Sequence, residues 1–399
     1  MISNKSATIQ RRSTKRPPEA TRRILFVTGS RGEWGYIRPI LRLIKARRGL
    51  SYSLVVTNMH LLPEFGASAK EITGEGWHVD QEIYMALDGY IGTSMTKSLG
   101  VFLLSIVDTL HRIRPDIIVL AGDRGEQLMT ALAGAHLNIP VAHIQAGEVS
   151  GNIDGMTRHA MARFVHLHFT ANDEAAQRLR RSGEQDFRIV TVGAPQLDEL
   201  LQVDGLTVDR VTTRFHLDRK QPVVLLVQHP VTEQIREAGE QMETTLRALA
   251  TLHHQTVLIY PNNDAGSTLV REAIDAFRAP WLRVVRNVSR EDYAGLLRIA
   301  GVLVGNSSSG IIEAPSFELP AVNIGRRQAG RVQALNVLNV DHDERAIRQA
   351  VQQACSPAFR ASLKKLKNPY GDGHASERII ERLATIPLDE RLLFKELAY

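Results

Sequence analysis

Residues 141–159 decide how the rest of this chain is interpreted, and they read VAHIQAGEVSGNIDGMTRH. A short apolar run, 141–144, ends in a glycine-containing loop that carries Glu148. The loop leads past Asp154 into a predicted helix that bears Arg158. In an open α/β sheet, ligands bind outside the carboxyl ends of the strands. We therefore expect the two carboxylates to face a ligand crevice, at the chemical centre of the protein.

Short apolar runs alternate with amphipathic stretches on both sides of this segment, which is typical of repeated βα units and parallel sheets. A first series runs from 24–28 to 188–192. A second series begins at 223–227, continues with a helix over 233–252 and reaches 321–324. The 399 residues exceed what a single compact core usually holds. We predict two parallel-sheet α/β domains that face each other across a cleft, the usual place for a ligand.

The predicted boundaries place the first domain at 23–200 and the second at 201–370. The start of the second domain, as far as about residue 221, is irregular in pattern and is expected to include the linker. A C-terminal helical segment, 371–399, is expected to pack across the junction and to join the first domain. Residues 1–22 are predicted to form a disordered basic extension, because charges dominate there and an apolar core is lacking.

The composition excludes several classes of protein. Hydrophobic residues make up 43% of the chain and charged residues 23%, as in a globular protein. Much of the formal charge of +6 lies in the extension, and elsewhere basic residues are mixed with acids, so nucleic-acid binding is not predicted. No apolar run approaches the length of a membrane span. The single cysteine, Cys355, and the lack of zinc-ligand spacing predict no disulfide and no metal, and a cytoplasmic location is expected.

Polar side chains follow three strands of the first series. Arg31 lies in a glycine-rich loop whose backbone N–H groups and guanidinium suit a phosphate, although a solvated arginine is the alternative. That loop lacks dinucleotide and P-loop spacing, so neither NAD nor Walker-type ATP binding is supported. His60 either faces the crevice or caps a turn. Asp123 and Arg124 form either a local ion pair or a substrate clamp with an acid, and the surrounding pattern favours the clamp.

The second series carries polar residues at the corresponding strand ends. His229 follows an apolar strand and precedes Pro230, which favours a role in the cleft over that of a satisfied core histidine. Asn262 lies in another polar loop, 260–267, that follows the next strand. Both residues are therefore expected to face the crevice from the second domain.

The densest polar signal is GNSSSG at 305–310, which follows an apolar strand and precedes a predicted helix. Its hydroxyls and N–H groups can bind an anion, and three serines exceed the single one that an N-cap needs; they are Ser307, Ser308 and Ser309. Glu313 can accept hydrogen bonds from ribose hydroxyls, or simply complement the helix dipole. Arg326, Arg327 and Arg331 follow the next strand and add positive charge for a diphosphate, and at least one of them is expected to be solvated only.

Six motifs in this order resemble those of the hydrolysing UDP-N-acetylglucosamine 2-epimerases of sialic-acid and related nonulosonic-acid synthesis. The motifs are Gly-Ser-Arg-x-Glu at 29–33, Thr-x-Met-His at 57–60, Gly-Asp-Arg at 122–124, Gly-Glu-Val-Ser-Gly-x-Ile-Asp at 147–154 with Arg-His at 158–159, Gly-Asn-Ser-Ser-Ser-Gly at 305–310, and Asn-Pro-Tyr-Gly-Asp-Gly at 368–373. The resemblance runs from about residue 23 to about residue 383.

The resemblance implies a GT-B-like architecture of two Rossmann-like domains and the conversion of UDP-GlcNAc and water to N-acetylmannosamine and UDP. In that family the reaction is thought to proceed by proton loss at C2 with elimination of UDP, followed by hydration of a 2-acetamidoglycal. By motif, Asp123, Glu148 and Asp154 form the acid/base set, with the base for C2 unassigned among them, and His229 lies near the diphosphate or the leaving oxygen. The implied UDP-sugar contacts are Arg31, His60, Arg124, Asn262, Ser307, Ser308, Ser309, Glu313, Arg327 and Arg331. No cofactor is implied, and a homodimer or homotetramer is expected.

Three positions depart from the family pattern. Gln145 stands where many relatives have His or Glu, and it cannot transfer a proton as an acid would, which shifts that role to Glu148 and Asp154. Gly155 replaces a second acid and is expected to leave an opening, and Trp34 replaces a usual tyrosine, so the sugar pocket is expected to differ.

A related branch of the family acts on UDP-N,N'-diacetylbacillosamine on the path to legionaminic acid, and this substrate is the alternative to UDP-GlcNAc. A 4-acetamido-6-deoxy sugar would need more room and less polarity in the pocket. Further alternatives are a non-hydrolysing 2-epimerase, a GT-B glycosyltransferase and a non-catalytic sugar-nucleotide binder.

Overall fold

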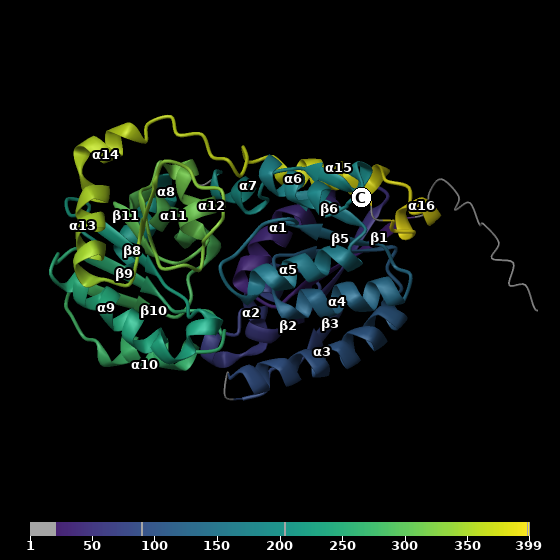
Figure 1. Ribbon diagram of the computed structural model, residues 1–399, viewed down its shortest axis with the longest axis horizontal. Helices are drawn as coiled ribbons and strands as arrows, with labels where there is room; N and C mark the ends of the chain where they lie inside the picture. Colours follow the sequence, from purple (N-terminus) through teal and green to yellow (C-terminus); the bar gives the residue numbers. More distant parts are fainter. Residues whose placement is uncertain (1–20, 89–90, 203–204, 397, 399) are drawn as a thin grey trace, which may run out of the picture.

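The computed structural model of the protein describes residues 21–88, 91–202, 205–396 and 398. Two parallel α/β domains lie side by side, the first at the right of Figure 1 and the second at the left. This arrangement confirms the predicted fold class. The predicted extension lies outside the described residues as far as position 20, and Arg22 already begins the first strand.

The first domain is built on a seven-stranded parallel sheet with the order β3-β2-β1-β4-β5-β6-β7. Its strands are β1 (Arg22–Thr28), β2 (Leu50–Thr57), β3 (Gln81–Ile83), β4 (Ile117–Ala121), β5 (Val141–Ile144), β6 (Leu167–Thr170) and β7 (Ile189–Thr191). The pattern of apolar runs does not predict β3, because only Ile83 of its three residues is buried.

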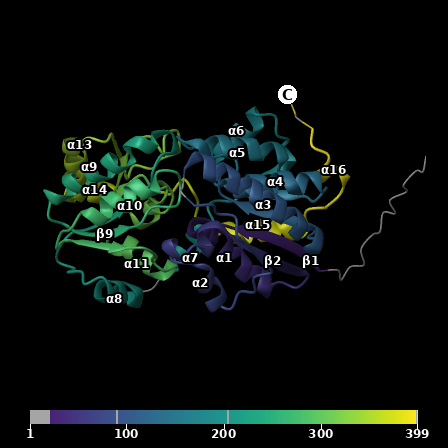
Figure 2. The same cartoon turned by 90° about the horizontal axis from the view of Figure 1, so that it is seen from below.

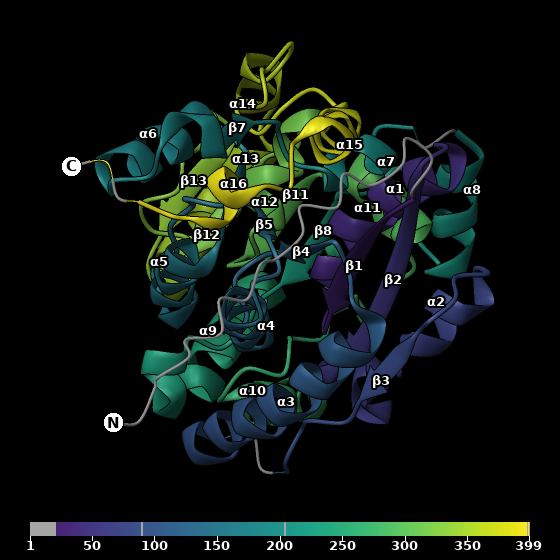
Figure 3. The same ribbon diagram turned by 90° about the vertical axis from the view of Figure 1, so that its right-hand side faces the viewer.

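Helices cover both faces of this sheet. They are α1 (Arg31–Ala46), α2 (Ala69–Gly74), α3 (Gly92–Ile113), α4 (Gly125–His136), α5 (Ile153–Phe164), α6 (Asp173–Arg181), α7 (Gln196–Leu200), α15 (Ala375–Thr385) and α16 (Glu390–Leu393), with 3-10 turns η1 (Asn58–Leu61), η2 (Pro63–Phe65) and η3 (Asp186–Arg188). Ile24 and Phe26 pack with α1 and α15, whereas Leu25 and Val27 pack with α3, α4 and α5 (Figure 3). The apolar run of β1 is continuous because both faces of the sheet are buried.

The second domain repeats the plan with a six-stranded parallel sheet in the order β10-β9-β8-β11-β12-β13. Its strands are β8 (Val223–Val227), β9 (Gln255–Ile259), β10 (Leu282–Val285), β11 (Val302–Gly305), β12 (Ala321–Ile324) and β13 (Val337–Val340). Its helices are α8 (Gly205–Arg214), α9 (Ala238–Ala250), α10 (Ser267–Ala276), α11 (Arg290–Ile299), α12 (Ser309–Ile312), α13 (Glu344–Cys355) and α14 (Pro357–Ser362), with 3-10 turns η4 (Thr232–Glu237) and η5 (Ala314–Phe317).

Two features of the second domain differ from the sequence-based expectation. The helix predicted over 233–252 is divided, because Gln234 leaves helical geometry (φ −125°, ψ 38°) and the regular helix begins only at Ala238. The stretch expected to hold the linker contains α8, which is tied to α11 by an ion pair of 2.9 Å between Arg210 and the fully buried carboxylate of Asp292.

In both sheets the strand order reverses direction at the centre, between β1 and β4 and between β8 and β11. Neighbouring strands there lead away in opposite directions, which leaves a crevice at their carboxyl ends. The two crevices face each other between the domains, so that the loops after these four strands form one cleft.

The chain crosses between the domains twice, and the crossings touch. It leaves the first domain through Gly193 and α7, which lies between the domains in Figure 2 and contacts both α1 and α11. It returns through 366–374 to α15. Ala194 N donates to Tyr370 O at 2.7 Å, and a Cβ on Gly371 would lie 3.1 Å from Gly193 Cα. Both glycines have positive φ, so this close crossing depends on the lack of side chains.

Candidate active site

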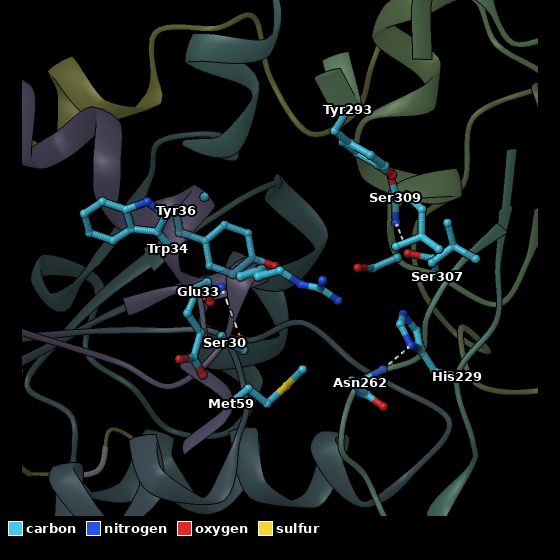
Figure 4. Close-up of a pocket in the computed structure, with 18 of the residues that line it drawn as sticks. Ser30, Glu33, Trp34, Tyr36, Met59, His229, Asn262, Tyr293, Ser307 and Ser309 are labelled. Carbon is cyan, nitrogen blue, oxygen red and sulfur yellow. Dashed lines mark hydrogen bonds between the residues drawn. The ribbon is translucent and has the colours of Figure 1, made fainter. Parts of the chain in front are cut away.

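The cleft between the domains is lined by residues of both sheets. Figure 4 shows Ser30, Glu33, Trp34, Tyr36 and Met59 on one side and His229, Asn262, Tyr293, Ser307 and Ser309 on the other. Twelve of the fourteen predicted site residues line it: Arg31, His60, Asp123, Arg124, Asp154, His229, Asn262, Ser307, Ser308, Ser309, Glu313 and Arg327. The other two, Glu148 and Arg331, lie behind this lining.

Asp123 follows β4 and lies between arginines of both domains. Its carboxylate pairs with the buried guanidinium of Arg158, and Arg331 Nη2 lies 3.8 Å away. Burial alone would raise the pKa of Asp123, but these neighbouring arginines, together with Arg327 and Arg124, hold it below its usual value. Asp123 is therefore a permanent carboxylate.

Asp154 lies in the first turn of α5 and has the opposite character. Asn152 Nδ2 donates to its Oδ2 at 2.8 Å, and Arg327 Nη2 lies 3.6 Å from the same oxygen. Burial, Asp123 and Asp264 raise the pKa of Asp154 to about 7. This acid can gain and lose a proton near neutral pH while its neighbour stays charged.

Glu33, which belongs to the first motif but has no role predicted from sequence, is a third buried acid of the cleft. It accepts a hydrogen bond of 2.5 Å from Gly29 N. Burial and the nearby carboxylate of Glu126 raise its pKa well above the ordinary value, which favours the protonated form. Asp123, Asp154 and Glu33 thus line the same side of the cleft with pKa values that are displaced in different directions or by different causes.

Glu148 is placed in the layer behind the lining. Its side chain is 2% exposed, and Asn172 Nδ2 donates to its Oε1 at 2.6 Å. The hydroxyl of Tyr370, from the segment that crosses back to the first domain, lies 3.4 Å from Oε2. Glu148 is not among the residues that line the cleft, and its role in proton transfer stays a prediction.

The three departures from the family pattern affect the cleft less than expected. Gly155 leaves no opening, because a Cβ built there would lie 2.6 Å from the carbonyl oxygen of Ser150. Gln145 is buried with a left-handed φ of 61° in the loop after β5. Trp34 lines the cleft but packs edge-on against Trp77 in the core, with ring centroids 6.0 Å apart.

Arg31 and His60 line the cleft, and both side chains form hydrogen bonds with other residues of the protein. Arg31 Nη1 donates across the cleft to Arg286 O and Asn287 Oδ1, both at 2.8 Å. The ring nitrogens of His60 lie 2.9 Å from Thr28 Oγ1 and 2.7 Å from Ser68 Oγ. Burial and Arg31 lower the pKa of His60 to about 3, so it is neutral and supports the loops around it.

Arg124 forms ion pairs with Glu126 of its own domain, at 3.3 Å, and with Asp264 of the opposite domain. Its guanidinium donates to Asp264 Oδ1 at 3.0 Å and to Asn263 Oδ1 at 2.8 Å. The local pair with Asp123 that the sequence left open is not the main contact. Arg124 instead joins the two faces of the cleft, and Asp264, which sequence analysis did not single out, is the partner.

His229 provides a neutral donor on the second-domain side. Asn262 N donates to its Nδ1 at 3.0 Å, which leaves the ring proton on Nε2. Burial, together with Arg327, Arg31 and Arg124, lowers the pKa of His229 well below the ordinary value, so the ring carries no charge. An Nε2–H group in a cleft lined by arginines is suited to donate to an anion.

The serine loop follows β11 as predicted. Gly305 has φ 123°, and a Cβ there would lie 2.1 Å from Val227 O, so the loop passes the end of β8 only with glycine. Ser309 N donates to Ser307 Oγ at 3.3 Å, and Ser309 Oγ bonds to the hydroxyl of Tyr293. The helix after the loop is one turn long and is followed by a 3-10 turn that begins at Ala314 and has Pro315 near its start. Tyr293, in the middle of α11, gives no signal in the sequence.

Glu313 and the arginines complete the second-domain side. Glu313 is 8% exposed, and its buried Oε2 has no hydrogen-bond partner within the described part of the chain. A buried acceptor that lacks a protein donor suits a hydroxyl of a ligand. Arg327 lines the cleft, whereas the side chain of Arg326 is 54% exposed and is the solvated arginine of the group. Arg331 lies behind the lining, where its Nε donates to Val149 O next to Glu148.

Across the residues that the structure describes, no group of three or more His, Cys, Asp or Glu side chains is arranged to hold a metal ion. No helix among them is long and apolar enough to cross a membrane.

The fold and the cleft together define a class of protein: a two-domain, GT-B-like chain in which acids of one domain face hydroxyl, imidazole and guanidinium groups of the other. The chain belongs to the UDP-N-acetylglucosamine 2-epimerase family, since the model described by that name matches residues 42–384. The resemblance carried by the six motifs is thereby confirmed.

Individual relatives agree with this assignment. The chain is 37% identical over 380 residues to the UDP-N,N'-diacetylbacillosamine 2-epimerase (hydrolyzing) of Legionella pneumophila, across 95% of this chain and 100% of the relative. It is 31% identical over 335 residues to the UDP-N-acetylglucosamine 2-epimerase of Neisseria meningitidis, across 84% of this chain and 88% of the relative. A crystal structure of the UDP-GlcNAc 2-epimerase from Neisseria meningitidis bound to UDP-GlcNAc matches with a TM-score of 0.77 at 18% identity, across 90% of this chain and 99% of that one. The last match shows the shared two-domain fold.

Proposed function

We propose that the protein is a hydrolysing UDP-sugar 2-epimerase, which converts a UDP-linked 2-acetamido sugar and water to the free 2-epimeric sugar and UDP. The observation that carries the proposal is the opposition of two unlike acids, Asp123 and Asp154, to an anion-binding loop and a neutral histidine in one cleft. An acid whose pKa is displaced toward neutrality in a cleft is typical of a catalytic site.

We assign Asp154 as the general base that removes the proton from C2. A general base works best when its pKa lies near the operating pH, and the pKa of Asp154 is about 7. Asp123 is a weaker base because arginines hold its pKa low. Its charge serves instead to stabilise positive character near the sugar and to keep Asp154 basic.

The bonds that change follow from this assignment. Asp154 takes the proton from C2, the C2–H electron pair forms the C1–C2 double bond, and the bond from C1 to the UDP oxygen breaks. Water then adds to the resulting glycal: its hydroxyl bonds to C1, and a proton returns to C2 on the other face. Because Asp123 stays ionised, this second proton is supplied by the water that adds, and the proton taken by Asp154 returns to solvent.

The departing diphosphate needs positive charge and hydrogen-bond donors. His229 offers its Nε2–H, the serine loop offers hydroxyls and N–H groups, and Arg327 offers a guanidinium, all from the second domain. Donors of this kind, held in place before the reaction, stabilise developing negative charge without reorganisation. Glu313 is left to accept from the ribose hydroxyls.

For the sugar itself, UDP-N,N'-diacetylbacillosamine is the favoured substrate, since the relative matched over its whole length carries that name at 37% identity. UDP-GlcNAc is the second candidate, supported by the relative at 31% identity. Either substrate gives a product suited to nonulosonic-acid synthesis. That pathway, the cytoplasmic location and the homodimer or homotetramer stay predictions.

The test is NMR of the reaction in D2O with each UDP-sugar in turn. The expected products are free UDP and a free manno-configured sugar with deuterium at C2. UDP that stays attached to the epimerised sugar would instead indicate a non-hydrolysing epimerase. An unlabelled sugar of unchanged C2 configuration would exclude elimination and hydration.

A further inference from the structure

Two loops from opposite domains meet behind the cleft. We call residues 148–154 of the first domain the acid loop and residues 326–332 of the second domain the basic loop. Gly151 N donates to Arg327 O at 3.0 Å, and Arg331 Nε donates to Val149 O at 2.8 Å. A Cβ on Gly151 would lie 1.9 Å from Arg326 O, so the two backbones approach this closely only because residue 151 is glycine.

Arg331 occupies the centre of this contact. Its side chain is 5% exposed, and Nη2 lies 3.0 Å from Ser150 Oγ and 3.8 Å from Asp123 Oδ2. Ser150 Oγ also accepts from Arg158 Nη1 at 3.3 Å. Arg158 and Arg331 thus flank Asp123 from the two domains, with Ser150 between them. Because Arg331 lies outside the lining of the cleft, the role in substrate binding predicted from sequence does not account for these contacts.

A third segment meets the same loops. Tyr370, in the Asn-Pro-Tyr-Gly-Asp-Gly motif, is fully buried, and its hydroxyl donates to Val332 O of the basic loop at 3.0 Å. The same hydroxyl lies 3.4 Å from Glu148 Oε2 of the acid loop. This motif forms one of the two crossings between the domains. The acid loop is therefore fastened at a point where both domains and their connection come together.

We propose that Arg331 is a positioning residue, which fastens the acid loop to the second domain and completes the cationic surroundings of Asp123 without contacting the substrate. The proposal rests on the proposed function for its chemical meaning. According to this proposal, Asp123 and Asp154 hold their catalytic positions only while the acid loop and the basic loop are in contact. Glu148 then serves as a further anchor of the acid loop.

The direction in which Arg331 shifts the pKa of Asp123 follows from its charge. The charged and titratable groups around Asp123 are Arg158, Arg331, Arg327, Arg124, Asp154, Glu33, Tyr36 and His143. Removal of one of the four arginines raises the pKa of Asp123. Activity that needs the Asp123 carboxylate would then be lost at a higher pH than in the wild type, so the steeper part of the kcat/KM profile, which lies below the limb set by Asp154, would begin at a higher pH.

The experiment compares Arg331→Met with Arg326→Met, which removes the same charge from the same loop at an exposed position. In Arg331→Met we expect kcat to fall by roughly 10²-fold, the scale of a misplaced catalytic group. UDP affinity, measured by calorimetry, should change by less than about fivefold because the side chain lies outside the cleft. Arg331→Lys keeps the charge and should recover part of kcat and restore the pH profile.

Hydrogen exchange of the peptide around residues 145–156 provides a measurement that does not depend on turnover. The Gly151 N–H is held by Arg327 O, so loosening of the contact should speed exchange there in Arg331→Met and leave it unchanged in Arg326→Met. Gly151→Ala should reproduce both effects by forcing the loops apart, even if Arg331→Met fails to fold.

Unchanged kcat and unchanged exchange in Arg331→Met would overturn the proposal. A loss of UDP affinity as large as the loss in kcat/KM, with kcat preserved, would also overturn it and would make Arg331 a substrate-binding residue. If the wild type releases no UDP from any UDP-sugar, the proposed function fails, and the exchange measurements still decide whether Arg331 fastens the acid loop.

Discussion

The two sides of the cleft rest on sheets with the same strand order, yet their chemistry is different. The first domain presents buried acids whose pKa values are displaced in opposite directions. The pKa of Asp123 is lowered, so this acid is held ionised, whereas the pKa of Asp154 is raised to about 7. The second domain presents a neutral histidine, serine hydroxyls and N–H groups, and Glu313 is its one acid among the described residues that line the cleft. The shared topology places both sets at the ends of central strands, and the loops decide what each set does.

This difference suggests a division of work: proton transfer on the first-domain side and binding of UDP on the second. Variants on the two sides should then fail in different ways. First-domain variants should lose kcat and keep UDP affinity. Variants of second-domain residues that line the cleft should lose UDP affinity, with or without a loss of kcat, whereas Arg331, which lies behind the lining, should behave like the first-domain acids.

The largest effect is expected for Asp154→Asn, which keeps the shape of the side chain and removes the proposed base. We expect kcat to fall by about 10³-fold, within the range for loss of general acid–base catalysis, with UDP affinity nearly unchanged. A coupled assay of UDP release measures kcat, and calorimetry measures the affinity for UDP. The matched control is Asp173→Asn, an exposed acid in the first turn of α6. A kcat within tenfold of wild type would remove Asp154 from the proposed role.

A somewhat smaller effect is expected for His229→Ala. The loss of one preorganised donor to a developing anion costs roughly 10²-fold in kcat. Because the same Nε2–H would contact the diphosphate of bound UDP, affinity for UDP should fall as well, which distinguishes this variant from Asp154→Asn. The half-buried His254, ahead of β9, provides a histidine-to-alanine control. Normal UDP affinity in His229→Ala would contradict the division between the two sides.

The sequence predicts only part of this division of roles between the two sides of the cleft. Apolar runs predict the central strands and the strand-end loops, because a strand buried on both faces must be continuously apolar. They do not predict the edge strands β3 and β13, whose residues are largely half-exposed or exposed. Loop position relative to strand ends was likewise sufficient to predict twelve of the residues that line the cleft.

What the sequence does not predict are contacts between loops far apart in the chain. Arg31 donates to residues 286–287, Arg124 to Asp264, and Arg331 to Val149, and none of these pairs has a local signal. The displaced pKa values depend on the same contacts. Sequence analysis could therefore identify Asp123 and Asp154 as candidate acids but could not tell which of them carries the titrating proton.

The pH dependence sharpens the distinction between these two acids. Asp154 must be ionised to accept the proton, and its pKa is raised to about 7, so kcat/KM should rise about tenfold per pH unit below pH 7 and level off above it. Asp264→Asn removes a nearby negative charge that helps to raise the pKa of Asp154, and the acidic limb should move to lower pH. A limb that stays in place, or that lies near pH 4 in the wild type, would count against Asp154 as the base.

The smallest effect is expected for Glu313→Gln, which tests the one acid on the second-domain side of the cleft. Its buried Oε2 lacks a partner among the residues that the structure describes, and a hydrogen bond from a ribose hydroxyl to a carboxylate contributes about 1.5–3 kcal/mol. Gln keeps an acceptor but loses the charge, so UDP affinity should fall by about tenfold while kcat at saturating substrate stays within about twofold. Glu318→Gln, at an exposed position a few residues further along the chain, is the control. If kcat fell and UDP affinity held, Glu313 would belong with the acids that move protons, and the division between the two sides of the cleft would be wrong.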